Sequence, residues 1–252
     1  MSDPERLTQT HLEQTNLNQA FRELAEFFAE TTYLHLVPQL LKFSEEIGAR
    51  VLEQDPFGQG LLQRIAKTNA KTRDARLRRI AKALEQAVPL FSELRFLQDA
   101  ISGIWHLEAN FNHWRGNGAW QREDQLSDGT LRLIGLLWSL QDGDGLLLLE
   151  EPELSLNDGI VKRIPLLIDR VLRDRKKNAL ARQVLVSTHS DALLAEVVGP
   201  ATLLLIESGP NGSVVRTPDP IETQSMAHGL NPAEVLLPRT RTQSLEQLGL
   251  FH

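Results

Sequence analysis

The sequence predicts an α/β fold, with helices in its first part and strands that alternate with helices further on. Apolar residues recur at helical spacing up to about residue 90. Two short all-apolar runs follow at residues 146–149 and 184–186, and a helix-like segment separates them. Such runs are typical of buried strands, and a helical crossover makes the two strands parallel. We therefore expect a helical arm over residues 1–92 and, over residues 93–252, an α/β lobe with parallel strands and a closing hairpin.

The composition excludes several classes of protein. The chain has 252 residues and a net charge of −6, and its 41% hydrophobic and 24% charged residues are ordinary globular values. It contains no cysteine, so it has neither a disulfide frame nor thiolate chemistry. No apolar run approaches the roughly 18 residues that span a bilayer, and the polar start has no signal region. We therefore expect a cytoplasmic protein.

The first part of the chain predicts two helices separated by a turn. One follows the candidate N-caps Thr15 and Asn16, and its apolar side chains recur on one face that we expect to pack inward: Leu17, Phe21, Leu24 and Phe28. Proline and two glycines between residues 55 and 60 predict the turn. The second helix carries an apolar stripe made of Leu77, Ile80, Leu84 and Val88.

The second helix lies in a strongly basic stretch. Between Leu61 and Leu84 there are eight basic residues and one acidic residue, a local charge of +7 that leaves −13 for the rest of the chain. Clustered cations can contact nucleic acid, although no interleaved aromatic residues indicate base stacking. The alternatives are a solvated helix or a docking face for an acidic partner. The candidate DNA contacts are Arg73, Arg76, Arg79 and Lys82.

From residue 94 the period changes from helical to alternating. Apolar side chains at every second position from Trp105 to Phe111 predict a half-buried strand, which residues 94–97 could pair with through a turn at 99–103. A flexible loop follows at residues 115–119. The further elements expected are a helix at 130–140, a strand at 146–151, a helix at 159–176 kinked or broken at Pro165, a strand at 183–188, and a hairpin of 201–207 with 213–216.

Carboxylates follow the first apolar strand, at the sheet edge where ligands bind in α/β folds. Glu150 and Glu151 end this strand, and Pro152 favours an extended Glu151 that points off the edge. One carboxylate could hold Mg²⁺, usually through water, and the other could orient or deprotonate a water. The alternative is that Glu150, Glu151 and Glu153 merely precede a helix, where acidic side chains favour the dipole.

Two further segments carry polar residues that could bind a phosphate. After the second apolar strand, His189 could contact a phosphate or a water, or the segment is a capping turn with Ser190 or Asp191 as N-cap. A Ser-His-Asp hydrolase triad does not fit, because its members come from distant positions. In residues 126–130, Ser127 or Asp128 can cap the next helix, and Gly129 allows close backbone approach. This turn is either an anion site or an ordinary N-cap.

The order and spacing of these segments resemble the head of an ABC/SMC-type ATPase. More closely, the sequence is similar to bacterial AAA-labelled predicted ATPases of the SMC-like, RecF-like and overcoming-lysogenization-defect groups. The resembling segments are the signature motif at 126–132 (LSDGTLR), the Walker B motif at 147–153 (LLLEEPE), the histidine switch at 187–190 (STHS), and residues 33–38 and 55–58. The resemblance implies a P-loop NTPase fold in which ATP binds between two heads.

The resemblance also implies roles for individual residues. It makes Glu150 the acid associated with Mg²⁺, Glu151 the general base for the water that attacks the γ-phosphate, and His189 the γ-phosphate sensor. Ser127 and Gly129 would contact the γ-phosphate of ATP held by the opposite protomer. The D-loop, which lines the dimer interface, would be residues 154–157 (LSLN).

Three departures from the family pattern bear on these roles. Glu150 stands in place of the more common aspartate, and Asp128 in place of glycine. The chain contains no G-x-x-x-x-G-K-[ST] motif, whose amides and lysine hold the β- and γ-phosphates. We therefore expect the isolated chain to bind ATP poorly and to obtain a P-loop from a preceding N-terminal segment or from another polypeptide.

The resulting expectation is an ATPase that uses ATP and Mg²⁺ in a homodimer or head–head assembly. Family resemblance implies coupling to a nucleic-acid effector, often a nuclease in phage defence or DNA repair. The alternative, motivated by the absent P-loop motif, is a non-catalytic interaction or DNA-binding module.

Overall fold

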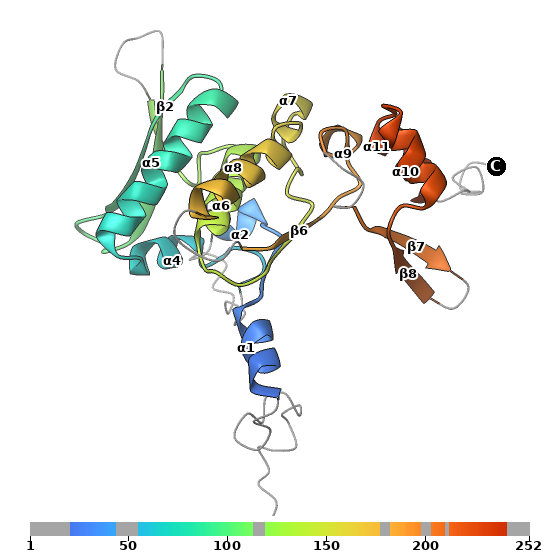
Figure 1. The fold of residues 1–252 in the computed structure, drawn as a ribbon. Helices are drawn as coiled ribbons and strands as arrows, with labels where there is room; N and C mark the ends of the chain where they lie inside the picture. Colours follow the sequence, from blue (N-terminus) through green and yellow to red (C-terminus); the bar gives the residue numbers. More distant parts are fainter. Residues whose placement is uncertain are drawn as a thin grey trace, which may run out of the picture. The chain divides into compact units, whose positions relative to one another are not determined.

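The structure is a computed structural model that describes residues 21–43, 55–112, 119–176, 182–197, 203–209 and 212–240. The chain forms two compact units, and Figure 1 shows the elements of both. The first comprises Met1–Ser155 with Asp169–Ser187, and the second Leu156–Ile168 with Thr188–His252. The boundary expected at residue 92 lies inside the first unit and stays a prediction.

A three-stranded parallel sheet lies in the first unit, in the order β1-β5-β6. Its strands are β1 (Thr32–Leu34), β5 (Leu147–Glu150) and β6 (Val184–Ser187), so both predicted apolar runs are confirmed as parallel strands. The prediction that these strands are buried on both faces of the sheet is wrong for the described residues. Leu147 and Leu149 are buried on one face, but Leu185, which shares the other face with Leu148, is 42% exposed.

Helix α6 (Asp128–Gln141) confirms the helix predicted at residues 130–140 and is buried along most of its length. Its packing is close at Gly135, where an added Cβ would lie 2.1 Å from Leu36 Cδ1. The short helix α2 (Pro38–Lys42) packs against α6. Arg182, which lies just before β6, donates hydrogen bonds to the Ser139 carbonyl in the last turn of α6 and to the Gly145 carbonyl just before β5. These hydrogen bonds hold the C-terminal end of α6 close to the start of β5.

The other sheet of the first unit is antiparallel and has the order β2-β3-β4. The predicted hairpin is confirmed, with Phe96 of β2 opposite Leu107 of β3. Strict alternation is wrong in β3, because Glu108 is also buried between Arg95 and Arg122, which both donate hydrogen bonds to it. The strands are β2 (Phe91–Gln98), β3 (Trp105–Phe111) and β4 (Ala119–Arg122).

Helices α4 (Leu61–Lys67) and α5 (Ala70–Ala87) follow the predicted turn, in which Gly58 has a φ of +73°. The apolar stripe of α5 is confirmed by the burial of Leu77, Ile80 and Leu84. Helix α5 lies along β2 (Figure 1).

Helix α1 (Arg22–Glu30) contradicts the expectation that its apolar face packs inward. None of its residues is buried, and Phe21, just before it, and Phe28 are each 53% exposed. A periodic pattern identifies the apolar face but not what covers it. Thr15, Asn16 and Leu17 lie outside the described residues, as does most of the loop expected at 115–119.

The helix expected at residues 159–176 is divided into α7 (Asp158–Val161) and α8 (Ile164–Lys176). The predicted break at Pro165 is confirmed, because this proline is the second residue of α8, where its missing N–H costs no helical hydrogen bond. Among the residues described, no helix has the length and apolar character that a membrane span needs.

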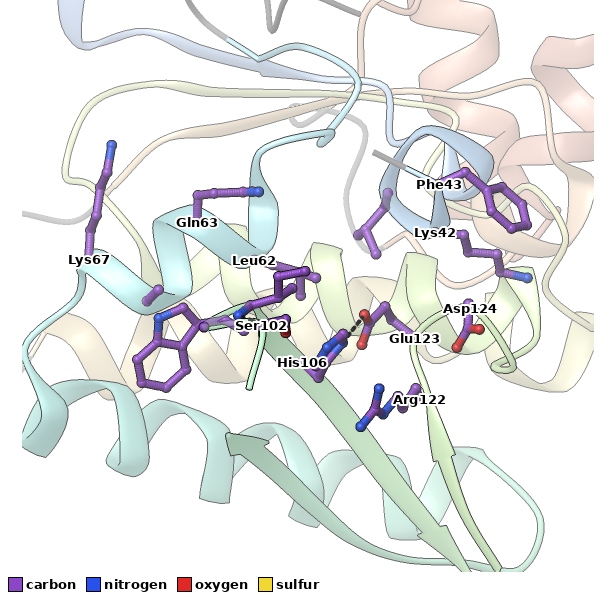
Figure 2. A pocket seen from close by; sticks show the side chains of 15 residues that line it. Lys42, Phe43, Leu62, Gln63, Lys67, Ser102, His106, Arg122, Glu123 and Asp124 are labelled. Atoms are coloured by element: carbon purple, nitrogen blue, oxygen red, sulfur yellow. Dashed lines mark hydrogen bonds and ion pairs between the residues drawn. The ribbon is translucent and has the colours of Figure 1, made fainter. Parts of the chain in front are cut away.

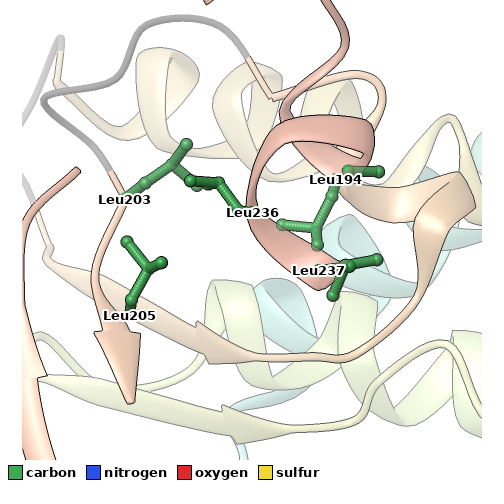
Figure 3. Close-up of a cluster of buried hydrophobic side chains, with 6 residues drawn as sticks. Leu194, Leu203, Leu205, Leu236 and Leu237 are labelled. Atoms are coloured by element: carbon green, nitrogen blue, oxygen red, sulfur yellow. The ribbon is translucent and has the colours of Figure 1, made fainter. Parts of the chain in front are cut away.

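The second unit contains the predicted closing hairpin, formed by β7 (Leu205–Gly209) and β8 (Gly212–Arg216). Helix α11 (Pro232–Thr240) packs against β7 and against the short helix α9 (Asp191–Leu194), and α10 (Pro220–Ala227) precedes α11. Figure 3 shows leucines from α9, from α11 and from β7 with the residues just before it converging on a small core. The buried members are Leu194, Leu203, Leu205, Ala233, Leu236 and Leu237.

Candidate nucleotide-hydrolysis site

Glu150 ends β5 beside a tyrosine of the neighbouring strand. Tyr33 lies opposite Leu148 in the β1–β5 register, and its hydroxyl donates a hydrogen bond to Glu150 Oε2. This hydrogen bond, together with burial and the nearby negative charge, raises the pKa of the Tyr33 hydroxyl, which therefore stays a neutral donor. Sequence reasoning missed Tyr33 because a three-residue strand has no diagnostic periodicity.

Glu151 adopts a different backbone conformation from the one expected. Its φ of +43° is in the left-handed region, so the extended conformation inferred from Pro152 is wrong. Tertiary hydrogen bonding outweighs the local preference, because the Glu151 N–H donates to Ser187 O of β6 at 3.0 Å. A left-handed non-glycine residue costs about 1–3 kcal/mol, and such strain clusters at functional sites. The chain turns sharply at Glu151, directly after Glu150.

Ser127 is confirmed as the N-cap of α6. Its Oγ accepts a hydrogen bond from the Thr130 N–H at 3.1 Å. Gly129 is the second residue of the helix, so its N–H belongs to the first turn, where backbone donors lack intrahelical partners. The geometry is that of a helix N-terminus able to receive an anion.

The negative charge of Asp128, the first residue of α6, is neutralised by Lys42 of the neighbouring helix α2. Its carboxylate accepts hydrogen bonds from Lys42 Nζ at 2.8 Å and Gln39 Nε2 at 2.6 Å. The hydrogen bond from Lys42 lowers the pKa of Asp128, and the resulting ion pair offsets the negative charge that Asp128 places at this turn. Lys42 is a site residue that sequence reasoning did not find.

Arg132 lies one helical turn after Asp128 on α6, and its guanidinium interacts electrostatically both with Asp128 and with the acidic residues that follow β5. Burial lowers the pKa of this guanidinium, whereas the negative charges of Asp128, Glu151 and Glu153 oppose the shift. Arg132 and Glu150 also line the same small pocket. These groups therefore form one neighbourhood within the first unit.

His189 belongs to the second unit, whereas Glu151 belongs to the first. The capping alternative at this segment is confirmed for Ser190, whose Oγ accepts a hydrogen bond from the Leu193 N–H at 3.3 Å. His189 is the residue directly before this cap. Its role as a γ-phosphate sensor, and its position relative to Glu151, stay predictions.

The proposed D-loop, residues 154–157, also divides between the units. Ser155 in the first unit has a φ of +63°, and Asn157 in the second caps α7 by accepting a hydrogen bond from the Ile160 N–H at 3.1 Å.

A cavity of about 520 Å³ lies beside the signature turn. Figure 2 shows its wall, where His106 Nδ1 and Glu123 Oε1 are 2.8 Å apart. Glu123 also accepts a hydrogen bond from the Leu107 N–H and precedes the signature turn in sequence. Lys42 also lines the cavity, and its Nζ donates a hydrogen bond to Asp128 at the start of α6. No sequence motif indicated this cavity.

The family model described as "AAA domain, putative AbiEii toxin, Type IV TA system" matches residues 5–195. The chain belongs to this family. Membership in this AAA family confirms the resemblance to AAA-labelled ATPases and implies nucleotide binding, typically with Mg²⁺. No curated protein matches the sequence.

Several solved SMC heads are similar to the chain. One, from work on ATP-driven dimerization and DNA-stimulated activation of SMC ATPases, is 17% identical, with 63% of this chain and 91% of that chain covered and a TM-score of 0.43. The Smc head with coiled coil and joint from Pyrococcus yayanosii is 18% identical (63% and 29% covered, TM-score 0.46). An SmcHead bound to the C-winged helix domain of ScpA is 20% identical (77% and 56% covered, TM-score 0.48). The chain thus spans less than two thirds of the latter two.

Proposed function

We propose that the chain is the catalytic-acid and signature part of an ATPase that hydrolyses ATP at a head–head interface and drives a nucleic-acid-directed effector. One observation carries the proposal. Two adjacent carboxylates end the central strand, the first hydrogen-bonded by Tyr33 and the second set in a left-handed turn anchored on β6. Adjacent carboxylates in unlike backbone conformations can perform different tasks in one reaction.

Each candidate residue then has a defined task. Glu150 would hold Mg²⁺, which supplies charge stabilisation at the phosphates when bound. A magnesium site of this kind needs one or two protein carboxylates plus water and phosphate oxygens. Glu150 fits this role, because it supplies one such carboxylate at the end of β5 and the hydrogen bond from Tyr33 engages only its Oε2. Glu151 accepts the proton of the attacking water.

The remaining contacts come from the signature turn and the switch histidine. In the proposed assembly, Ser127 and Gly129 present the first turn of α6 to the γ-phosphate of ATP held by the opposite head. His189 is the proposed γ-phosphate sensor. Lys42 keeps the carboxylate of Asp128 from repelling it, because the two side chains form an ion pair at 2.8 Å.

The P-loop would come from a segment outside these residues or from another polypeptide, and β6 is where its strand would join. Among the described strands, β6 pairs with β5 alone, and Leu185 leaves apolar surface beside this edge. At the other edge, the chain just beyond β1 is already occupied. There the His35 and Val37 N–H groups donate to the carbonyls of Pro56 and Phe57.

The test is ATP turnover with a P-loop polypeptide supplied. Glu151→Gln should lower turnover by at least about 100-fold, because general-base catalysis contributes on that scale, and should leave nucleotide binding intact. Glu85→Gln, the same chemical change at an exposed position of α5, is the matched control. Equal turnover in the two variants would contradict the role of Glu151. A complemented wild type without turnover would instead favour the non-catalytic module.

A nucleic-acid contact through α5 is a second candidate function, with a revised set of residues. Arg73 lies over the rings of Phe96 and Trp105, and Arg76 forms a 2.7 Å ion pair with Asp142. These two arginines therefore serve internal packing, and the expectation that they contact DNA is not supported. Arg79 and Lys82 are exposed, although Arg79 also donates a hydrogen bond to Gln141.

The favourable observation is a row of exposed cations on one helical face. Lys71, Arg78 and Lys82 are separated by seven and four positions and are all exposed. Reversing all three to glutamate should weaken duplex binding and reduce its salt dependence, since each lost phosphate contact lowers the slope by about one. Reversal of Lys162, exposed in the second unit, is the control. Unchanged duplex affinity in the triple variant would exclude this surface.

A further inference from the structure

Tyr33 reaches Glu150 because of the strand register. In the parallel β1–β5 pair, Tyr33 is opposite Leu148, so Tyr33, Leu148 and Glu150 project from the same face of the sheet. Glu150 is then the diagonal neighbour of Tyr33, a separation that an aromatic side chain can span. The hydroxyl accordingly donates to Glu150 Oε2.

The consequence for Glu150 is a single held orientation. A glutamate has one more rotatable bond than the aspartate common at this position, so its carboxylate samples more positions unless a partner restrains it. Tyr33 is anchored by its strand and has two side-chain torsions, which makes it a suitable restraint. Within the described part of the chain, no other hydrogen bond to the Glu150 carboxylate is found, and Oε1 is left to bind another group.

We propose that Tyr33 is a positioning residue that fixes the Glu150 carboxylate for a divalent cation, which makes glutamate workable where the family commonly has aspartate. This inference rests on the proposed function. Tyr33 acts through Glu150 and touches neither nucleotide nor metal. Partners that orient a metal-binding carboxylate typically contribute about 10- to 100-fold in metal affinity.

The contact itself can be tested without activity, because Tyr33 is the single tyrosine of the sequence. Labelling with 3-fluorotyrosine therefore yields one ¹⁹F resonance in the intact chain. Glu150→Gln should shift this resonance, whereas Glu85→Gln, on exposed α5, should leave it in place. A resonance that does not respond to Glu150→Gln would overturn the contact and the proposal.

The positioning role is tested by cation binding in the chain complemented with a P-loop polypeptide and ATP. Tyr33→Phe, which removes only the hydroxyl, should weaken Mn²⁺ affinity, measured by electron paramagnetic resonance, by about 10-fold. The Mg²⁺ concentration for half-maximal turnover should rise equally, while the rate at saturating Mg²⁺ recovers. Thr32→Val removes a hydroxyl from the preceding residue of β1 and should change neither value.

A double-mutant comparison separates action through Glu150 from a general effect on the fold. In the Glu150→Gln background, Tyr33→Phe should change Mn²⁺ affinity no further. A wild type that binds Mn²⁺ with the same affinity as Tyr33→Phe would overturn the positioning role and leave the proposed function standing. A complemented wild type that binds no Mn²⁺ would overturn both.

Discussion

Replacing Arg182 by methionine tests how helix α6 is held to strand β5. Arg182 is 4% exposed and donates through Nε to Gly145 O at 2.7 Å and through Nη1 to Ser139 O at 2.5 Å and to Asp142 O. A hydrogen bond from a charged donor contributes about 1.5–3 kcal/mol, and a buried acceptor left unpaired is costly. Because water can replace part of this bonding, we expect the free energy of unfolding to fall by about 3–5 kcal/mol.

Equilibrium unfolding in urea, followed by tryptophan fluorescence, measures this loss. Trp138 on α6 is fully buried and reports on the same part of the molecule. Arg173→Met is the matched control, because Arg173 is 75% exposed and pairs with Asp169 one helical turn away. An exposed pair of this kind contributes at most about 0.5 kcal/mol. If Arg182→Met lost no more stability than the control, the reasoning about the three carbonyls would be refuted.

Three further predictions concern the same unit. Lys42→Met should raise the pKa of Asp128 toward its ordinary value and weaken the binding of an anion at the N-terminus of α6. A ¹H–¹³C titration of the Asp128 carboxyl measures the first effect, and phosphate binding measures the second. An unchanged pKa of Asp128 would contradict the prediction. The lowered pKa of Asp128 also means that its contribution to stability is present above the ordinary aspartate pKa and is lost as the pH falls through the folded value. Urea unfolding across that acidic range should therefore show a steeper loss in the wild type than in Lys42→Met, and parallel curves would contradict it. Gly145→Ala should destabilise by about 1–3 kcal/mol, because the added Cβ would lie 2.3 Å from the backbone carbonyl oxygen of Glu30, and an unchanged thermal midpoint would argue against that packing.

Local features of the fold were predictable where neighbouring residues dictate them. The hairpin of β2 and β3 follows from alternation and from a turn in which Asp99 Oδ1 accepts hydrogen bonds from the Ile101 and Ser102 N–H groups. The caps Ser127 and Ser190 follow from a hydroxyl placed three residues before a free N–H. Each of these depends on contacts within a few residues, so their sequence signals are strong.

Predictions failed where a partner distant in sequence decides the outcome. Pro152 favours an extended Glu151, yet the hydrogen bond to Ser187 O holds Glu151 in the left-handed region. The apolar face of α1 was identified, but its exposure depends on what packs near it. Glu108 is buried in a position that alternation assigns to solvent, because two arginines neutralise it.

The same distinction between local and distant contacts applies to the residues of the candidate site. Residue order alone placed Glu150 and Glu151 after a buried strand and Ser127 before a buried helix, because strand and helix periodicity are local properties of the chain. The partners of these residues come from elsewhere, with Tyr33 separated by 117 positions from Glu150 and Lys42 by 86 from Asp128. Strand register and helix packing bring such pairs together, and both are set by the whole buried core. The acidic residues Glu150, Glu151 and Asp128 could therefore be predicted from the sequence. Tertiary structure alone determines that Tyr33 orients Glu150 and that Lys42 neutralises Asp128.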